Sequence, residues 1–419
     1  MCDIRLNKSS LLGEITVCSS KSVAHRAVIA AALSGRDITV KNVTPSKDIY
    51  ATLNGIKALG VSYIFENETV IIKKSILNKN KKLSFNAGES GSTLRFLIPV
   101  FTALGNETTF SGEGRLPMRP LDDYLEIFDK NSVCYEKGEC YLPLTVRGTF
   151  KETVFDVRGD VSSQFITGLM LSSLATDKEI TINITTNLES KGYVDITAKV
   201  LEDFGCSVLF KDNTVKIKKG ICSIDEYIVE NDWSQAAFFL VAGAVAGDVT
   251  LRNMNLSSPQ GDKEIVSVLE KAGADITRGS DFVKIVKSKI NGFLCDASDI
   301  PDLVPILSVL GAFAKGKTHL YNLKRLRLKE SDRIESTVSM LRAFGVKCES
   351  GDDYITIYGE NSLCDAFVDS FNDHRIVMSS AVMALKGGTT LIKNYKAVDK
   401  SYPGFFEDYF RLGGKGEIL

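Results

Sequence analysis

The sequence has little of what metal centres and disulfide scaffolds require. It contains three histidines, His25, His319 and His374, which are too few for a histidine-rich metal site. Its nine cysteines form no CxxC pair and are odd in number, so we expect reduced thiols rather than a disulfide framework. No Walker GxxxxGKS loop, no GxGxxG after a strand, no HExxH and no GxSxG elbow occurs. These absences disfavour P-loop, dinucleotide-binding, zinc-protease and serine-hydrolase activities.

Long apolar runs and a charge of one sign are missing too. The longest apolar stretch, around residues 238–247, is too short to span a bilayer, and the start MCDIRLNKSS lacks the apolar core of a signal peptide. Lys and Arg number 51 and Asp and Glu 52, which gives a net charge of −1 at pH 7. Overall attraction to nucleic acid is therefore excluded, and any anion site must be local. We expect a cytoplasmic protein that binds neither membrane nor nucleic acid.

What the sequence does contain is a sixfold repeat. An apolar helix-like run that leads into a short strand recurs at intervals of about 70 residues. The strands are centred on Thr39, Thr109, Thr181, Thr250, His319 and Thr390. An amphipathic stretch that ends near Gly keeps the same period, ending at Gly60, Asn131, Gly205, Gly273, Gly345 and Gly413. Two markers with one period indicate a repeated supersecondary unit.

The elements of each repeat predict an α/β fold. Their order is helix, strand, helix and then a pair of strands, the pair being clearest in SVLFKDNTVKIKKG and VKCESGDDYITIYG. The runs FFLVAGAVAG and LVPILSVLGAF are apolar on every face, which is typical of buried helices. We predict two similar domains, each with three repeats around buried helices. The N-terminal domain is predicted to span residues 11–225, and the C-terminal domain residues 1–10 and 226–419, with two chain crossings at one hinge.

Basic residues gather where the helices are expected to begin. They are Lys21, Arg26, Arg95, Arg119, Lys329, Arg333, Arg375 and Lys400. A cation at a helix N-terminus opposes the helix dipole, so such a repeated placement indicates a compensating anion. Free N–H groups and arginine forks both favour phosphate or carboxylate. The residues alone therefore predict that several helix starts converge on a substrate, or two, with several negative charges.

Carboxylates among these cations are candidates for proton transfer. Asp302 in IPD and Glu330 in KESDR occupy corresponding helix starts, and Asp302 is alternatively an N-cap. Asp332 and Asp373 are expected to orient neighbouring arginines. The chemistry that fits these residues is group transfer between anionic small molecules without a metal or organic cofactor.

The motifs together resemble one family. They are KSVAHR, the Gly-rich loop ending in TLR, PMRP, DVSSQF, SKGYVDIT, IPD, LKESDR, NDHR and DKSYPGFF, in this order along nearly the whole chain. This set is similar to that of the 5-enolpyruvylshikimate-3-phosphate synthases. The resemblance implies two domains of three βαβαββ units each, with the active site in the cleft between them. It also implies transfer of the enolpyruvyl group of phosphoenolpyruvate to the 5-hydroxyl of shikimate-3-phosphate by addition and elimination, on the shikimate pathway to chorismate.

The resemblance also implies which residues act. Shikimate-3-phosphate is expected at Lys21, Ser22, Arg26, Ser162, Ser163, Gln164, Ser190, Tyr193, Asp302 and Lys329. Phosphoenolpyruvate is expected at Lys21, Gly91, Arg119, Gln164, Arg333, Arg375 and Lys400. Asp302, Glu330, Lys21 and Lys400 are the implied catalytic residues, and which of the last three moves which proton stays open. The family implies no metal and no cofactor, and a monomer is expected.

The chain departs from the common pattern of the family at a few positions. Glu89 and Ser92 stand where many members have Asn and Thr, which bears on phosphoenolpyruvate affinity and on the response to the inhibitor glyphosate. Arg325, Gly192 and Trp233 replace residues that are more usual there. None of these changes removes an implied catalytic group.

Two alternatives accompany this interpretation. A UDP-N-acetylglucosamine enolpyruvyl transferase has the same fold, but the pair Lys21-Ser22 and the absence of Cys from residues 112–120 disfavour it. The second alternative is a non-catalytic anion-binding protein of this fold. The carboxylates Asp302 and Glu330 disfavour it, because a protein that only binds anions gains nothing from carboxylates beside its cations.

Overall fold

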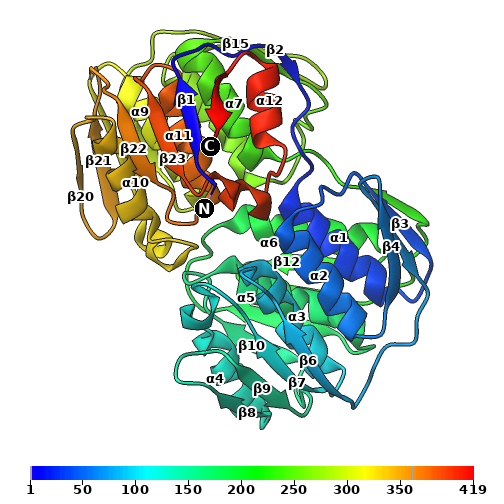
Figure 1. Cartoon of the computed structure of the whole chain (residues 1–419). Helices are drawn as coiled ribbons and strands as arrows, with labels where there is room; N and C mark the ends of the chain where they lie inside the picture. The colour runs from blue at the N-terminus through cyan, green and yellow to red at the C-terminus, as the bar shows by residue number, and fades with distance from the viewer. Residues whose placement is uncertain (1, 361) are drawn as a thin grey trace. The chain divides into compact units, whose positions relative to one another are not determined.

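The structure is a computed structural model that describes residues 2–360 and 362–419. The chain divides into two compact units (Figure 1). Unit 1 contains the segment that ends at Cys18 together with Asn231–Leu419, and unit 2 contains Ser19–Glu230. The predicted α/β class with two similar halves is confirmed.

Unit 2 holds three repeats. Its elements are α1 (Lys21–Leu33), β3 (Ile38–Lys41), α2 (Lys47–Ala58), β4 (Ser62–Glu66), β5 (Thr69–Lys73), β6 (Lys82–Asn86), α3 (Gly91–Ala103), β7 (Glu107–Ser111), η1 (Leu116–Met118), α4 (Asp122–Asn131), β8 (Cys134–Lys137), β9 (Leu144–Arg147), β10 (Val154–Val157), α5 (Ser163–Ser172), η2 (Ser173–Ala175), β11 (Ile180–Ile184), α6 (Lys191–Asp203), β12 (Ser207–Lys211), β13 (Thr214–Lys218) and β14 (Glu226–Ile228). Its sheets have the strand orders β14-β3-β5-β4, β6-β7-β9-β8 and β10-β11-β13-β12.

Unit 1 repeats the same plan. Its elements are β1 (Ile4–Asn7), β2 (Leu12–Ile15), α7 (Trp233–Ala246), β15 (Asp248–Leu251), η3 (Gly261–Glu264), α8 (Ile265–Lys271), β16 (Asp275–Arg278), β17 (Val283–Val286), β18 (Leu294–Asp296), η4 (Pro301–Leu303), α9 (Val304–Phe313), β19 (Lys317–Tyr321), η5 (Lys324–Leu328), α10 (Arg333–Ala343), β20 (Cys348–Ser350), β21 (Tyr354–Tyr358), β22 (Ala366–Asp369), α11 (His374–Ala384), β23 (Thr390–Lys393), η6 (Tyr395–Lys400), α12 (Phe405–Arg411) and β24 (Lys415–Ile418). Its sheets run β16-β17-β15-β2, β18-β19-β21-β20 and β22-β23-β1-β24.

The strand that opens a repeat is an edge strand, and two of these edge strands pair with a strand that is far away in the sequence. β2 directly precedes α1 but pairs in parallel with β15, with Leu12 opposite Asp248. β14 directly precedes α7 but pairs in parallel with β3, with Glu226 opposite Thr39. The chain therefore leaves each unit after the edge strand, and it passes from one unit to the other at residues 18–19 and 230–231, whereas the predicted bounds are 10–11 and 225–226. The alternation of apolar and polar residues along a strand indicates which face of the strand is buried, but it does not identify the neighbouring strand, which explains the difference between the predicted and the observed bounds.

Other pairings follow the sequence pattern. The opening strand β1 lies in unit 1 between β23 and β24, as predicted for the C-terminal domain, with Ile4 opposite both Ile392 and Ile418. The two clearest strand pairs form the antiparallel hairpins β12-β13 and β20-β21.

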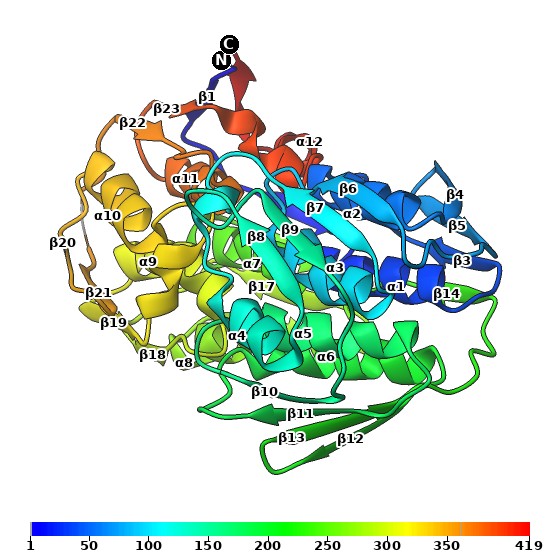
Figure 2. The same cartoon turned by 90° about the horizontal axis from the view of Figure 1, so that it is seen from below.

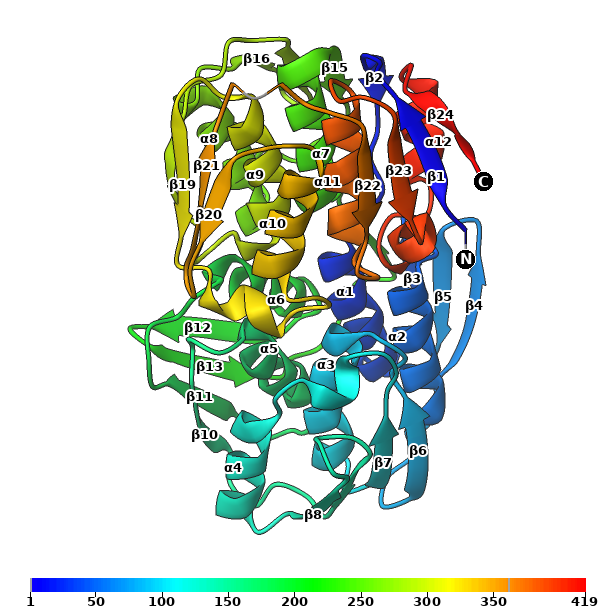
Figure 3. The same cartoon turned by 60° about the vertical axis from the view of Figure 1, so that its left-hand side comes forward.

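Buried helices form the core of each unit. Every residue of α7 is buried, and so is almost all of α9, as their all-round apolar sequences predict. These two helices pack against each other and against α11. Helices α9 and α10 also cover the sheet that contains β19, β20 and β21, as Figure 3 shows. In unit 2, α3 packs on α5, while α5 and α6 cover the sheet β10-β11-β13-β12 (Figure 2).

The structure bears on two further sequence features, the cysteines and the apolar helices. All nine cysteines are free thiols, and burial raises the pKa of Cys206, Cys295 and Cys348. Among the described residues, no helix has both the length and the apolar character that crossing a membrane requires.

Candidate active site

In unit 2, three buried helices begin with a serine cap. Ser20, Ser90 and Ser162 precede α1, α3 and α5, and each side-chain oxygen accepts a hydrogen bond from a backbone N–H of the first turn. These caps occupy one free donor at each helix start and leave others exposed to a ligand. We call the predicted site residues of unit 2 the unit-2 cluster; they are Lys21, Ser22, Arg26, Gly91, Arg119, Ser162, Ser163, Gln164, Ser190 and Tyr193.

Lys21 begins α1 and already has an anionic partner. Its Nζ lies 2.7 Å from Oδ2 of Asp48, a residue in the first turn of α2, and both side chains are mostly buried. The carboxylate compensates part of the charge that opposes the α1 dipole. Asp48 was not among the sequence candidates, because an acidic residue in a first helical turn is common on dipole grounds alone.

Arg26 lies inside unit 2 with only 2% of its surface exposed. Its Nε donates to the Thr197 hydroxyl at 2.7 Å, and Nη1 donates to the carbonyl of Ser22 at 2.6 Å. Nη2 donates to the Thr167 hydroxyl and to the Tyr193 carbonyl. Burial lowers the pKa of Arg26 to about 9. Arg26 thus connects α1 with α5 and α6, and two of its four acceptors belong to implied substrate-binding residues.

Gln164 is held between two side chains from α3. Arg95 Nη1 donates to its Oε1 at 2.8 Å, and its Nε2 donates to the Ser92 hydroxyl at 2.9 Å. Ser92, the residue that departs from the family pattern, therefore still orients Gln164. Gly91 allows the Arg119 guanidinium to approach the start of α3, because a Cβ at this position would collide with Arg119 Nη1.

The remaining members of the cluster lie at the starts of α5 and α6. Ser163 and Ser190 are buried, and Ser190 has a left-handed backbone with a φ of 55° directly before α6. The Tyr193 carbonyl accepts from Thr197 as well as from Arg26.

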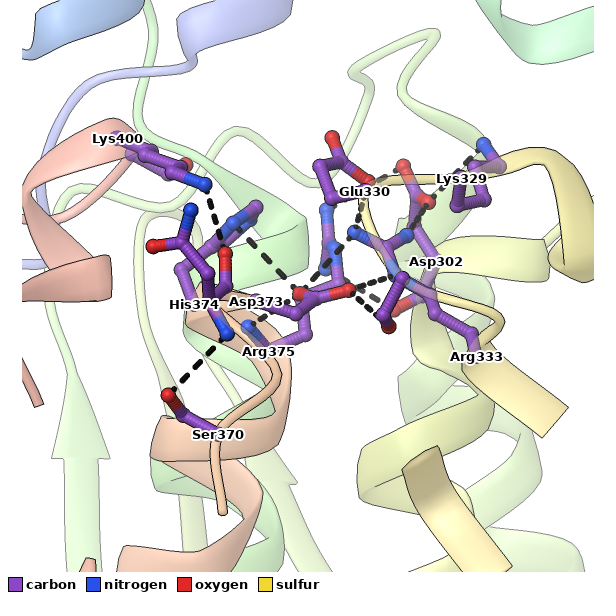
Figure 4. Close-up of polar contacts among 12 residues, drawn as sticks. Asp302, Lys329, Glu330, Arg333, Ser370, Asp373, His374, Arg375 and Lys400 are labelled. Carbon is purple, nitrogen blue, oxygen red and sulfur yellow. Dashed lines mark hydrogen bonds and ion pairs between the residues drawn. The ribbon is translucent and has the colours of Figure 1, made fainter. Parts of the chain in front are cut away.

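In unit 1, Asp302 lies among three cations, as Figure 4 shows. Its Oδ1 is 2.7 Å from Arg333 Nη1 and 3.3 Å from Lys329 Nζ. Its Oδ2 is 3.3 Å from Arg375 Nη2, and its backbone carbonyl accepts from Arg375 Nη1. The Asp302 side chain caps no helix, so the N-cap alternative is wrong. We call the predicted site residues of unit 1 the unit-1 cluster; they are Asp302, Lys329, Glu330, Arg333, Arg375 and Lys400.

Arg333 is the most enclosed cation of this cluster, with 1% of its side chain exposed. Its guanidinium contacts Asp373 at 2.8 Å and Glu330 at 2.6 Å in addition to Asp302. Burial alone lowers the pKa of Arg333, but the three carboxylates outweigh burial and raise it. In the same way, burial raises the pKa of Asp373, but Arg333 outweighs burial and lowers it. The expectation that Asp373 orients an arginine is confirmed.

Two lysines complete the unit-1 cluster. Burial lowers the pKa of Lys329, opposed by the charge of Asp302. Lys400 is buried at the end of η6 and donates to the carbonyl of Asn372 at 2.7 Å (Figure 4). Asp332 caps α10 and pairs with Arg327 at 2.9 Å, so it also orients an arginine, as expected.

The sequence predicted that these cations are compensated by a bound anion, but the protein itself supplies part of the compensating charge. Protein carboxylates accompany Lys21, Lys329, Arg333 and Arg375 within their own units. Three of the eight predicted cations, Lys21, Arg333 and Arg375, lie in the first turn of a helix. The others lie a turn inside a helix (Arg26 and Arg95) or at the end of a 3-10 turn several residues before the next helix (Arg119, Lys329 and Lys400). Sequence reasoning missed Asp48 and the buried pair Ser234 and Asp262. The described residues hold no group of three or more His, Cys, Asp or Glu side chains placed to bind a metal ion.

Comparisons with known proteins identify the family of the chain. The family model described as EPSP synthase (3-phosphoshikimate 1-carboxyvinyltransferase) matches residues 6–409. A 3-phosphoshikimate 1-carboxyvinyltransferase from Clostridium novyi (strain NT) is 42% identical over 429 residues, covering 99% of this chain and 98% of the relative. A protein of the same name from Clostridioides difficile (strain 630) is 38% identical over 430 residues, again covering 99% of this chain and 98% of the relative.

Solved structures show the same fold. The structure of EPSP synthase from Acinetobacter baumannii superposes with a TM-score of 0.83 at 25% identity and covers 100% of both chains. The enolpyruvyl transferase NikO from Streptomyces tendae has a TM-score of 0.78 at 15% identity, with 100% of this chain and 99% of that one covered, which shows the fold alone. With the family model matching nearly the whole chain and close relatives aligned over their full length, the chain belongs to the EPSP synthase family.

Proposed function

We propose that the protein transfers the enolpyruvyl group of phosphoenolpyruvate to the 5-hydroxyl of shikimate-3-phosphate and releases phosphate. The observation that carries this proposal is Asp302, a mostly buried carboxylate in contact with Lys329, Arg333 and Arg375. The cations can bind the phosphate and carboxylate groups of the substrates, and the carboxylate can accept the hydroxyl proton. The relatives named 3-phosphoshikimate 1-carboxyvinyltransferase support the choice of substrates.

We assign the substrates to the residues that the family resemblance implied. Shikimate-3-phosphate is held by Lys21, Ser22, Arg26, Ser162, Ser163, Gln164, Ser190, Tyr193, Asp302 and Lys329. Phosphoenolpyruvate is held by Lys21, Gly91, Arg119, Gln164, Arg333, Arg375 and Lys400. Both sets contain residues of unit 1 and of unit 2.

The first proposed step is addition. The 5-oxygen attacks the central carbon of phosphoenolpyruvate as Asp302 takes the hydroxyl proton, and the methylene carbon gains a proton from Glu330, Lys21 or Lys400. The product is a tetrahedral intermediate with a methyl group. The arginines at 2.7 Å and 3.3 Å from Asp302 are placed to stabilise the charge on the substrate carboxylate and phosphate.

The second proposed step is elimination. The bond between the central carbon and the phosphate oxygen breaks and phosphate leaves with the bonding electrons. The methyl group returns a proton to the protein, which restores the carbon–carbon double bond of the product. We further propose that the enzyme acts as a cytoplasmic monomer without a metal or cofactor, as the resemblance implies.

Phosphate release tests the proposal. Purified protein mixed with shikimate-3-phosphate and phosphoenolpyruvate is expected to release one phosphate for each enolpyruvyl group transferred, as followed by a phosphate assay and by phosphorus NMR of the product. A parallel reaction with UDP-N-acetylglucosamine in place of shikimate-3-phosphate is expected to release none. Phosphate release with UDP-N-acetylglucosamine but not with shikimate-3-phosphate would identify the other enolpyruvyl transferase activity. If no phosphate were released with either acceptor, the protein would be better explained as a non-catalytic anion-binding protein.

A further inference from the structure

One buried carboxyl of unit 1 has no role in the proposed reaction. Asp262 lies in η3 and is 4% exposed. Its Oδ2 accepts a hydrogen bond from the Ser234 hydroxyl, while its Oδ1 is buried without a hydrogen-bond partner in residues 2–360 and 362–419. Leaving one oxygen of a buried carboxyl unsatisfied costs stability, so its presence indicates a function other than packing.

Ser234 connects Asp262 to the unit-1 cluster. It lies in the first turn of α7, and its hydroxyl oxygen accepts a hydrogen bond from Arg375 Nη2 at 3.3 Å. Because the Ser234 proton points to Asp262, the lone pairs of the hydroxyl face the guanidinium. Arg375 Nη1 donates to the Asp302 carbonyl at 3.0 Å, and Nη2 also lies 3.3 Å from the Asp302 carboxylate. Ser234 and Asp302 together hold the guanidinium of Arg375.

The charges around Asp262 come from three other elements. Asp302 of η4 and Asp232, the cap of α7, repel a negative charge at this site, and Arg375 of α11 attracts it. The neighbours on its own element turn elsewhere, since Lys263 donates to the Ser258 carbonyl and Glu264 pairs with Lys271 of α8. Burial, followed by the charge of Asp302, raises the pKa of Asp262 to about 7. The group therefore exchanges its proton near neutral pH.

We propose that Asp262 is a positioning residue that acts through Ser234 to hold Arg375 in place for phosphoenolpyruvate. The inference rests on the proposed function, because it assigns to Asp262 the orientation of an arginine in that site. It predicts that Asp262 and Ser234 act as one unit, and that their loss weakens binding of phosphoenolpyruvate far more than binding of shikimate-3-phosphate.

Steady-state kinetics of four variants test this. Asp262→Ala and Ser234→Ala are each expected to raise KM for phosphoenolpyruvate roughly tenfold, the effect of losing one hydrogen bond to a charged group. KM for shikimate-3-phosphate should not change, and kcat should stay within about threefold. The double variant should be no worse than the worse single variant, because both changes cut the same connection. Asp262→Asn can still accept from Ser234, so it should restore most of the affinity.

The matched control is Asp408→Ala. Asp408 is also a carboxyl of unit 1. It accepts a hydrogen bond from the Tyr402 hydroxyl and pairs with Arg411, and neither of these side-chain partners within the described residues is a proposed site residue. Its kinetic constants should equal those of the wild type. An unchanged KM for phosphoenolpyruvate in both Asp262→Ala and Ser234→Ala, or additive effects in the double variant, would overturn the inference alone. A wild type that releases no phosphate would overturn the proposed function first.

A second measurement does not depend on activity. A carboxyl whose pKa is raised on folding stabilises the fold fully below the pKa of the unfolded chain, and this contribution is lost as the pH rises toward 7. The wild type is therefore expected to lose thermal stability relative to Asp262→Asn between about pH 4 and pH 7, with a constant difference above pH 7. A difference in melting temperature that does not vary over this range would contradict a proton exchange at Asp262.

Discussion

The two clusters present different chemistry on repeats of one plan. In the unit-2 cluster, Arg26 and Gln164 make their contacts with hydroxyls, an arginine and backbone carbonyls. In the unit-1 cluster, the single guanidinium of Arg333 contacts three carboxylates. Hydroxyl and amide groups orient a bound phosphate or hydroxyl, whereas carboxylates held beside cations can move protons. Under the proposed function, we therefore expect the loss of a unit-2 side chain to act mainly on KM and the loss of Asp302 in unit 1 to act mainly on kcat.

The largest expected effect is that of Asp302→Asn. The amide keeps the shape of the side chain but cannot take the 5-hydroxyl proton, so kcat should fall by about 10²–10⁴, the range for removal of a general base. KM for phosphoenolpyruvate should stay constant or fall, since Arg333 and Arg375 lose a competing negative charge. Initial rates of phosphate release at saturating substrate give kcat directly.

A surface carboxylate of the same unit serves as the control for Asp302. Asp352 is fully exposed and lies 3.6 Å from Arg327, and Asp352→Asn should leave kcat unchanged. If Asp302→Asn raised both KM values and spared kcat, Asp302 would be a binding residue and the distinction between the clusters would fail.

The next effect is that of Lys21→Ala in unit 2. Removing the ammonium group leaves the start of α1 without a charged donor and Asp48 without its ion pair, so kcat/KM should fall by about 10². Most of this loss should lie in KM if unit 2 mainly binds. The measurement is a full set of initial rates with both substrates varied, together with calorimetric binding of shikimate-3-phosphate.

Two variants complete the test of Lys21. Asp48→Asn keeps the ammonium group and removes its internal competitor, so it should not weaken binding of the anionic substrates. Lys57→Ala, on the exposed face of α2, should have no effect. A loss that falls wholly on kcat in Lys21→Ala would assign proton transfer to unit 2 as well.

Much of the fold was predictable because it depends on periodic patterns. The repeat, the fully apolar helix α7 and the serine cap of α1 all follow from residues that are close in the sequence. The pairing of β2 and β14 was not predictable, because the partner of each strand lies more than 180 residues away, as the pairing of Glu226 with Thr39 illustrates.

The candidate site was predictable by residue type but not by pairing. Cations at helix starts stand out in the sequence, which is how Arg333 and Arg375 were found. Their partners Asp373 and Ser234 come from other elements, and only the packed core decides which carboxyl meets which guanidinium. Asp262 was missed because a lone acidic residue in a short 3-10 turn carries no periodic signal, and its burial appears only in the structure.

The smallest expected effect on turnover, and the sharpest check on the comparison, is that of Arg26→Lys. A lysine cannot reach the four acceptors that the guanidinium serves on α1, α5 and α6, so the free energy of unfolding should fall by about 2–3 kcal/mol. KM for shikimate-3-phosphate should rise less than in Lys21→Ala, because the substitution keeps the positive charge that the proposed contact with the substrate needs. Urea unfolding and substrate titration of one preparation measure both quantities.

The control is Arg36→Lys, at an exposed ion pair with Asp225, which should change neither the free energy of unfolding nor KM. Undiminished stability with a KM raised as far as in Lys21→Ala would mean that the guanidinium of Arg26 serves only the substrate and does not stabilise the packing of α1 against α5 and α6.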